Sequence, residues 1–216
     1  MPQFQENEFF LTIADPPYFD AAARLGYYGC RRSATGVNRV KYKLKHWELP
    51  DKPFFDEIKR VSEHQIVWGE NYFSKLMYHP GRIVWDKVCA NNSFSDAEIA
   101  MCTVHNKTVL FPYMWNGMMQ GKSLSEGRTM QGNKKKNQKR IHPTEKPIEL
   151  YKWLHLKYNP DRRPCLDTHG GSMSHAIACI ELGVPLVIIE SDPAMFDQAL
   201  KRIKQRYAQT FINYEE

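Results

Sequence analysis

The tetrapeptide Asp15-Pro16-Pro17-Tyr18 combines residue types that could activate a poorly nucleophilic amine. In an exocyclic amine of a nucleobase, the nitrogen lone pair is delocalised into the ring. A carboxylate (Asp15) and a backbone carbonyl (Pro16) can accept the N–H hydrogens of such an amine and aim its lone pair at an electrophile. Each proline fixes φ near about −65°, which would hold that carbonyl in place, and Tyr18 would offer its ring to the base. Acceptors preorganised around a nitrogen that gains positive charge mirror an oxyanion hole.

The segment 166–174 could bind the other reactant. It follows a predicted strand and opens a predicted helix, and Gly170 and Gly171 permit a tight turn that a ligand can approach closely. Glu190 ends the next predicted strand, where an acid can accept hydrogen bonds from ribose hydroxyls. The GxGxxG pattern of nicotinamide sites is absent, so an acid at the ribose and Asp167 near a cationic group fit an adenosyl sulfonium better.

Both motifs also have a purely structural interpretation. A proline-rich turn that ends a strand would contain the same four residues, and glycine turns often only close strand–helix packing.

The elements that must position these motifs follow from apolar patterning. Buried strands are predicted at 9–14, 64–68, 82–86, 163–167 and 185–190, and an antiparallel hairpin at 98–104 and 108–115 with a polar turn at 105–107. Helices are predicted over 51–63, after Thr144 with Ile148, Tyr151, Leu154 and Tyr158 on one stripe, over 175–182, and after the capping residue Asp192 with Phe196, Leu200, Ile203 and Tyr207 facing inward.

This alternation predicts an α/β fold in one domain spanning 1–216, with a mostly parallel twisted sheet and helices on both faces. Ligands of such sheets bind at the carboxyl ends of the strands. Three predicted strands carry an acid at that end, namely Asp15, Asp167 and Glu190. We therefore expect these acids to mark one ligand site.

The net charge of +6 is concentrated in two stretches. Residues 19–50 form a predicted basic loop that would face a polyanion such as DNA, and 116–140 a short, flexible basic loop that is poor in apolar residues. The predicted phosphate-binding residues are Arg31, Arg32, Arg39, Lys41, Lys43, Lys134, Lys135, Lys136, Lys139 and Arg140. A pair of solvated loops remains the alternative interpretation.

Composition excludes other classes of protein. The hydrophobic fraction of 42% is typical of globular chains, and no apolar run approaches the roughly 20 residues that span a bilayer. The N-terminus lacks the pattern of a signal peptide, so we expect a cytoplasmic protein. The five cysteines are scattered without zinc-ligand spacing, and no metal is expected.

Several motifs in one order carry a resemblance to a known family. Besides the tetrapeptide, they are WGENYF (68–73), GRIVWDK (81–87), NSFSDAEIA (92–100), HPTEKPIELYKWL (142–154), LDTHGGSMS (166–174) and IIESD (188–192). The sequence resembles the beta-class amino-methyltransferases of DNA found in phages and bacteria, from about residue 9 to residue 207. The resemblance implies a Rossmann-like methyltransferase fold with circularly permuted motifs, the catalytic half first and the cofactor half last.

The same resemblance implies function. It implies methyl transfer from S-adenosylmethionine to N6 of adenine in double-stranded DNA after base flipping, in a phage or restriction-modification setting. The alternatives are an N4-cytosine enzyme and a catalytically silent DNA-binding protein. Relatives with cytosine specificity more often have serine in place of Asp15, and beta-class relatives are often homodimers. Catalysis would fall to Asp15, Pro16, Pro17 and Tyr18. The cofactor site would comprise Asp15, His142, Pro143, Thr144, Lys146, Asp167, Thr168, His169, Gly170, Gly171, Ser172, Glu190 and Asp192.

Two features depart from that family's pattern. Met173 stands where relatives usually carry a second glycine of the cofactor turn, which could narrow the pocket. The segment 116–140 replaces a longer target-recognition region, and this predicts a short or relaxed recognition sequence.

Overall fold

The computed structural model describes residues 1–18, 48–89, 95–116, 119–142 and 144–212 of the 216-residue chain. Seven strands form one sheet in the order β5 (Thr108–Pro112), β3 (Arg82–Asp86), β4 (Ala97–Cys102), β2 (Ser62–Trp68), β1 (Phe9–Ala14), β8 (Cys165–Asp167) and β9 (Leu186–Ile188). Within this sheet only β4 pairs antiparallel, with β2 and β3. The predicted mostly parallel α/β fold is confirmed.

The predicted hairpin between 98–104 and 108–115 is wrong in its pairing, because β3 lies between β4 and β5. The turn after β4 encloses the start of β3: Cys102 N–H donates to the Gly81 carbonyl, and Arg82 N–H donates to the Lys107 carbonyl. A Cβ on Gly81 would lie 1.8 Å from the His105 carbonyl oxygen. Because Gly81 has no side chain, the start of β3 can lie against this turn, and β3 can pair between β4 and β5.

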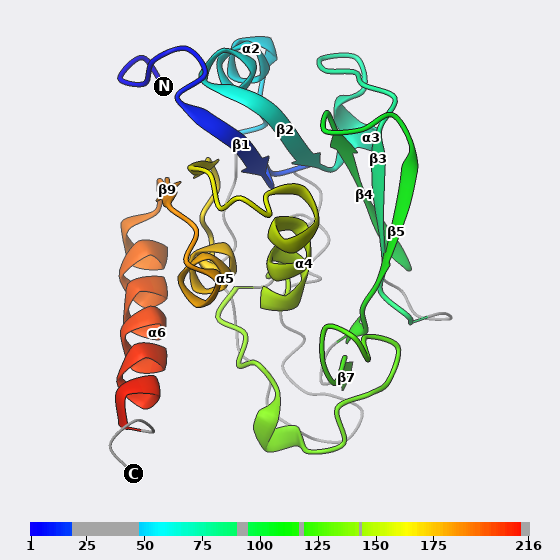
Figure 1. Ribbon diagram of the computed structural model, residues 1–216, viewed down its shortest axis with the longest axis vertical. Helices are drawn as coiled ribbons and strands as arrows, with labels where there is room; N and C mark the ends of the chain where they lie inside the picture. The colour runs from blue at the N-terminus through cyan, green and yellow to red at the C-terminus, as the bar shows by residue number, and fades with distance from the viewer. Residues whose placement is uncertain (19–47, 90–94, 117–118, 143, 213–216) are drawn as a thin grey trace.

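Helices cover both faces of the sheet. In Figure 1, α2 (Lys52–Val61) and α4 (Ile148–Tyr158) lie on opposite sides of β1 and β2. Successive strand residues point to opposite faces. Ile13 accordingly packs in one cluster with residues of α4 and α5 (Ser174–Leu182), whereas Ala14 packs with Phe55 of α2 and with Phe73 of the short helix α3 (Glu70–Phe73).

The helix α6 (Pro193–Ile212) lies at the edge of the molecule beside α5 (Figure 1). Its start is capped as predicted, since Ala194 N–H donates to Asp192 Oδ1 at 3.0 Å. The predicted inward stripe is only partly correct: Ile203 packs inward, but Phe196 and Tyr207 are each 39% exposed. A helix at the edge of a molecule packs against the rest of the protein through only a narrow stripe of its surface, and here that stripe includes the buried Ala199.

The segment 116–140 contains more regular structure than the sequence predicts. It holds an antiparallel pair, β6 (Trp115–Asn116) with β7 (Met119–Gln120), and a 3-10 helix, η1 (Lys134–Lys136). A hydrogen bond of 2.9 Å from Gln120 Nε2 to the Gln138 carbonyl links this strand pair to the end of the segment. The predicted 19–50 loop lies outside the described residues, except for its end at 48–50. Among the helices that the structure describes, none is long and apolar enough to cross a membrane.

Candidate active site

Three neighbouring parallel strands bring the predicted acids to one edge of the sheet. Ile13 of β1 stands opposite Asp167 of β8, and Asp167 stands opposite Ile188 of β9. Asp15 and Glu190 each follow within two residues of these positions, so all three acids lie at the carboxyl ends of adjacent strands. The two sequence-distant motifs therefore share one edge, as predicted.

Asp15 is held in a compact polar cluster. Its Oδ1 accepts a hydrogen bond of 2.5 Å from the Tyr18 hydroxyl and one of 2.6 Å from Lys146 Nζ. The same ammonium donates to the Tyr18 hydroxyl at 2.9 Å. Lys146 arrives from the segment before α4, 131 residues along the chain from Asp15. The fold thus places the strongest motif of the sequence against a lysine of the HPTEKP segment.

Glu98 on β4 completes this cluster and was not singled out from the sequence. Its Oε2 lies 2.9 Å from Lys146 Nζ, and its Oε1 lies 2.7 Å from Lys87 Nζ. The available signal was a glutamate within an otherwise apolar strand pattern, inside one of the motifs that carry the family resemblance. Sequence alone does not show which strand will lie beside which, so the pairing with Lys146 could not be read from it.

Burial and charge act in opposite directions on these groups. Burial raises the pKa of Asp15, and the nearby Lys146 only partly offsets this. Burial would also raise the pKa of Glu98, but Lys146 and Lys87 outweigh it and lower that pKa to about 2. Burial opposes the charge of Lys146, yet Asp15 and Glu98 hold its pKa above the usual value. Of the two carboxylates, Asp15 therefore takes up a proton more readily.

The Tyr18 ring is enclosed by aromatic neighbours. It stacks on Tyr72 with centroids 5.6 Å apart and planes 10° apart, and Phe73 meets it edge-on. Gly69 has a φ of +75°, and a Cβ there would lie 2.2 Å from the Tyr18 ring, so only glycine fits this position. Pro16 is buried and Pro17 half-buried. One face of the predicted base-stacking ring is thus covered by a half-exposed tyrosine.

The glycine turn is held by hydrogen bonds from its backbone N–H groups to two carboxylates. The buried Asp167 accepts from His169 N–H at 2.9 Å through Oδ1 and pairs with His175 Nδ1 at 2.8 Å through Oδ2. Glu190 accepts from Gly171 N–H and Asp192 N–H, both at 2.7 Å. A Cβ on Gly170 would lie 3.0 Å from the Ile188 side chain, so a larger residue here would require that side chain to shift.

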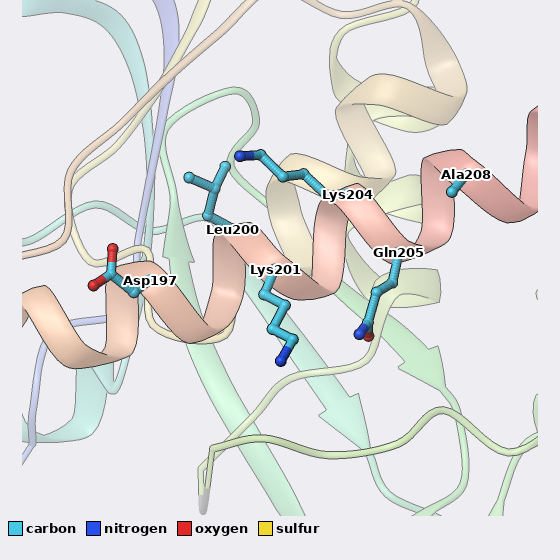
Figure 2. A pocket seen from close by; sticks show the side chains of 6 residues that line it. All are labelled: Asp197, Leu200, Lys201, Lys204, Gln205 and Ala208. Atoms are coloured by element: carbon cyan, nitrogen blue, oxygen red, sulfur yellow. The ribbon is translucent and has the colours of Figure 1, made fainter.

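A hollow of about 450 Å³ opens beside this turn. Its lining residues come from the turn, from both sides of Glu190, from α2 and from the N-terminus: Thr168, His169, Ile189, Ser191, Pro53, Phe54, Glu57 and Met1. A second hollow, of about 510 Å³, lies on the outer side of α6 and is lined by that helix alone (Figure 2). The first hollow is therefore the one associated with the predicted site.

Met173 does not line the hollow at the turn. Its side chain is 2% exposed and packs with Ala176 of α5 and Ala199 of α6. Its φ of +54° is the left-handed conformation that favours glycine. The glycine expected at this position thus has a backbone reason, and the methionine takes the same conformation while its side chain packs between α5 and α6.

The remaining predicted residues are placed as follows. Thr144 Oγ1 lies 3.1 Å from His142 Nδ1 and is exposed, Thr168 Oγ1 lies 2.9 Å from His169 Nδ1, and Ser172 Oγ lies 3.1 Å from Ser174 Oγ. Lys134, Lys135, Lys136 and Lys139 are exposed, and the Arg140 guanidinium lies 4.1 Å from the Trp115 ring centroid. Pro143, Arg31, Arg32, Arg39, Lys41 and Lys43 lie outside the described residues.

A group of possible metal ligands lies behind Asp167, formed by His155, His175 and Cys179. His155 Nε2 lies 2.8 Å from His175 Nε2 and 3.2 Å from Cys179 Sγ. Because His175 Nδ1 bonds the Asp167 carboxylate, a hydrogen bond from one imidazole to the other accounts for the first of these contacts without a metal.

Comparison with solved structures places this architecture. No protein-family model matches the chain, and no curated protein sequence matches it. The structure is similar to the PvuII DNA methyltransferase (cytosine-N4-specific), with a TM-score of 0.53 and 10% identity over 96% of this chain and 87% of the other. It is also similar to M1.HpyAVI in its SAM complex, with a TM-score of 0.52 and 16% identity over 91% and 89%. The chain has the Rossmann-like fold of these methyltransferases.

Proposed function

We propose that this protein is an S-adenosylmethionine-dependent DNA methyltransferase that modifies the exocyclic amine of a base, N6 of adenine. The observation that carries the proposal is the shared strand edge, where the acid of the Asp15 tetrapeptide and the acids of the glycine turn meet. Similarity of fold to DNA methyltransferases supports it.

The residues at the turn fit the cofactor. Each Glu190 oxygen accepts one backbone N–H and retains acceptor capacity for a ribose hydroxyl. The apolar Ile189 and Phe54 line the adjacent hollow, where a planar adenine could pack. When bound, S-adenosylmethionine would supply a methyl group on a sulfonium. Asp167, Thr168, His169, Gly170, Gly171, Ser172, Glu190 and Asp192 would hold its adenosyl part, and His142, Pro143 and Thr144 its methionine end.

The chain's own part in the reaction is to orient and activate the amine. Asp15 and the Pro16 carbonyl would accept its two N–H hydrogens and direct the lone pair at the methyl carbon. Methyl transfer would form an N–C bond as the C–S bond breaks, the C–S electron pair would stay on sulfur as a neutral thioether, and the methylated amine would release one proton to solvent. The target base would be flipped out of the duplex toward Tyr18. Because Tyr72 stacks on one face of the Tyr18 ring, the base could stack on that face only after Tyr72 moves; otherwise it would have to approach Asp15 without stacking there.

Adenine is proposed over cytosine because an aspartate opens the tetrapeptide. N4-cytosine is the second candidate, since the same acceptors suit either amine and one similar structure is cytosine-N4-specific.

Exposed lysines of the 116–140 segment would bind the DNA backbone. Lys134, Lys135, Lys136 and Lys139 can contact phosphates without reading sequence, which fits relaxed recognition. In Figure 1 this segment lies below α4, on the side toward which the arrowheads of β1 and β2 point. The arginines and lysines of the 19–50 segment are proposed to extend the same surface.

Calorimetry with S-adenosylmethionine tests the proposal against a silent DNA-binding protein. An active enzyme releases or absorbs heat on binding the cofactor, whereas a dead pocket gives no signal. A methylation map of cells expressing the protein then tests relaxed recognition, and a long, strict consensus would count against it.

A further inference from the structure

The ammonium of Lys146 is buried and fully engaged by the cluster around Asp15. The side chain is only 3% exposed, and Nζ contacts Asp15, Tyr18 and Glu98 within 2.9 Å. The rings of Trp68 and Tyr18 lie 5.3 and 5.4 Å from it. An ammonium this deeply buried requires opposite charge nearby, and the carboxylates of Asp15 and Glu98 supply it.

We propose that Lys146 and Glu98 are positioning residues that set the orientation and proton affinity of Asp15 for methyl transfer. The inference rests on the proposed function, in which Asp15 must be ionised to accept an N–H of the target amine. It assigns Lys146 to the proposed catalytic carboxylate instead of the cofactor site in which the family resemblance placed it.

Orientation follows from where the contacts fall. Tyr18 and Lys146 both bond Oδ1 of Asp15, and among the described residues no hydrogen bond falls on Oδ2. One oxygen therefore anchors the carboxylate while the other keeps its lone pairs for the substrate. Two anchors on one oxygen fix the carboxylate plane better than a single charged contact, because the planar group can otherwise rotate about its Cβ–Cγ bond.

Proton affinity follows from how charge is shared. Lys146 favours the ionised form of Asp15, whereas Glu98 opposes it. Glu98 forms its own ion pair with Lys146 through Oε2, and its Oε1 pairs with Lys87. The other titratable groups that interact electrostatically with this carboxyl are Tyr18 on its own segment, Tyr151 on α4 and His169 in the glycine turn. The lysine and the glutamate thus act on Asp15 in opposite directions.

This opposition makes the inference testable in the free protein. The Asp15 carboxyl can be followed by ¹³C NMR titration with labelled aspartate, and its resonance assigned by its loss in Asp15→Asn. We expect Lys146→Met to move the Asp15 titration to higher pH and Glu98→Gln to move it to lower pH. Lys152→Met is the matched control, since it breaks a lysine–glutamate pair with Glu181 between α4 and α5, and it should leave the Asp15 titration unchanged.

Kinetics then separate positioning from cofactor binding. Lys146→Met should lower kcat by roughly 100-fold, as expected for a misplaced reacting group, with cofactor affinity unchanged within a few fold. The acid limb of the kcat–pH profile should move in the same directions as the NMR titration, and Lys146→Arg should restore part of the turnover.

Two results would overturn the assignment: titration shifts of the same sign in both variants, or loss of cofactor affinity in Lys146→Met without a shift of the Asp15 titration. Since the NMR measurement needs no substrate, it succeeds or fails separately from the methyltransferase proposal, which wild-type protein tests on DNA.

Discussion

At the scale of single residues, the proposed function assigns methyl transfer to Asp15 and cofactor binding to other residues. Asp15→Ala should keep the affinity for S-adenosylmethionine within a few fold and abolish turnover, because the glycine turn and Glu190 do not depend on the Asp15 side chain. Calorimetry and nucleoside analysis measure the two properties separately. Simultaneous loss of binding and turnover would show that Asp15 supports the cofactor pocket itself.

Met173 illustrates a conflict between backbone and packing at one residue. Removing its buried side chain should cost about 2–5 kcal/mol in the free energy of unfolding. Its left-handed φ costs a non-glycine residue about 1–2 kcal/mol. Met173→Gly should therefore be more stable than Met173→Ala, the reverse of the usual order in a helix interior. Urea unfolding of the two variants checks this, and a less stable glycine variant would argue against the strained backbone.

At the scale of elements, α4 and α5 meet through the buried pair His155 and His175. Burial, together with His175, lowers the pKa of His155 to about 3. The unfolded chain binds this proton near pH 6.5 and the folded protein only near pH 3, so acidification through this window favours unfolding. The resulting loss of stability is at most about 1.4 kcal/mol per pH unit.

The contribution of His155 can be isolated with a variant. His155→Phe removes the titrating group, so its free energy of unfolding should vary less steeply with pH between about 6 and 3 than that of the wild type. Denaturant unfolding at several pH values measures both slopes. Parallel pH dependences would mean that another group, such as a buried carboxyl, dominates this window.

Element patterns predicted the strands that position Asp15, Asp167 and Glu190, because a short apolar run ending in an acid depends only on local sequence. The pairing of β3 could not be predicted in the same way. Two apolar strands joined by a three-residue polar turn have the same sequence pattern whether they pair with each other or with a third strand between them. Glu98 and Tyr72 escaped prediction for a related reason: each joins the site through contacts between distant segments. Met173 stands out in the sequence as a departure, but only its φ explains the position.

At the scale of the whole molecule, DNA binding should depend on salt through the lysines near η1. Replacing Lys134, Lys135, Lys136 and Lys139 with glutamine should reduce the slope of log K against log salt by about 0.9 for each phosphate that is no longer neutralised. The affinity for S-adenosylmethionine should not change. DNA binding measured across a salt series provides the test, and an unaltered slope would place the DNA elsewhere on the protein.

In the proposed function, the carboxyl edge of the sheet presents an amine to a sulfonium carbon. The most direct test of this function incubates the protein with methyl-labelled S-adenosylmethionine and unmethylated DNA, and then identifies labelled nucleosides by mass spectrometry. We expect label in N6-methyldeoxyadenosine with the wild type and none with Asp15→Ala. Label in N4-methyldeoxycytidine would correct the base, whereas the absence of label from every nucleoside would contradict methyl transfer to DNA.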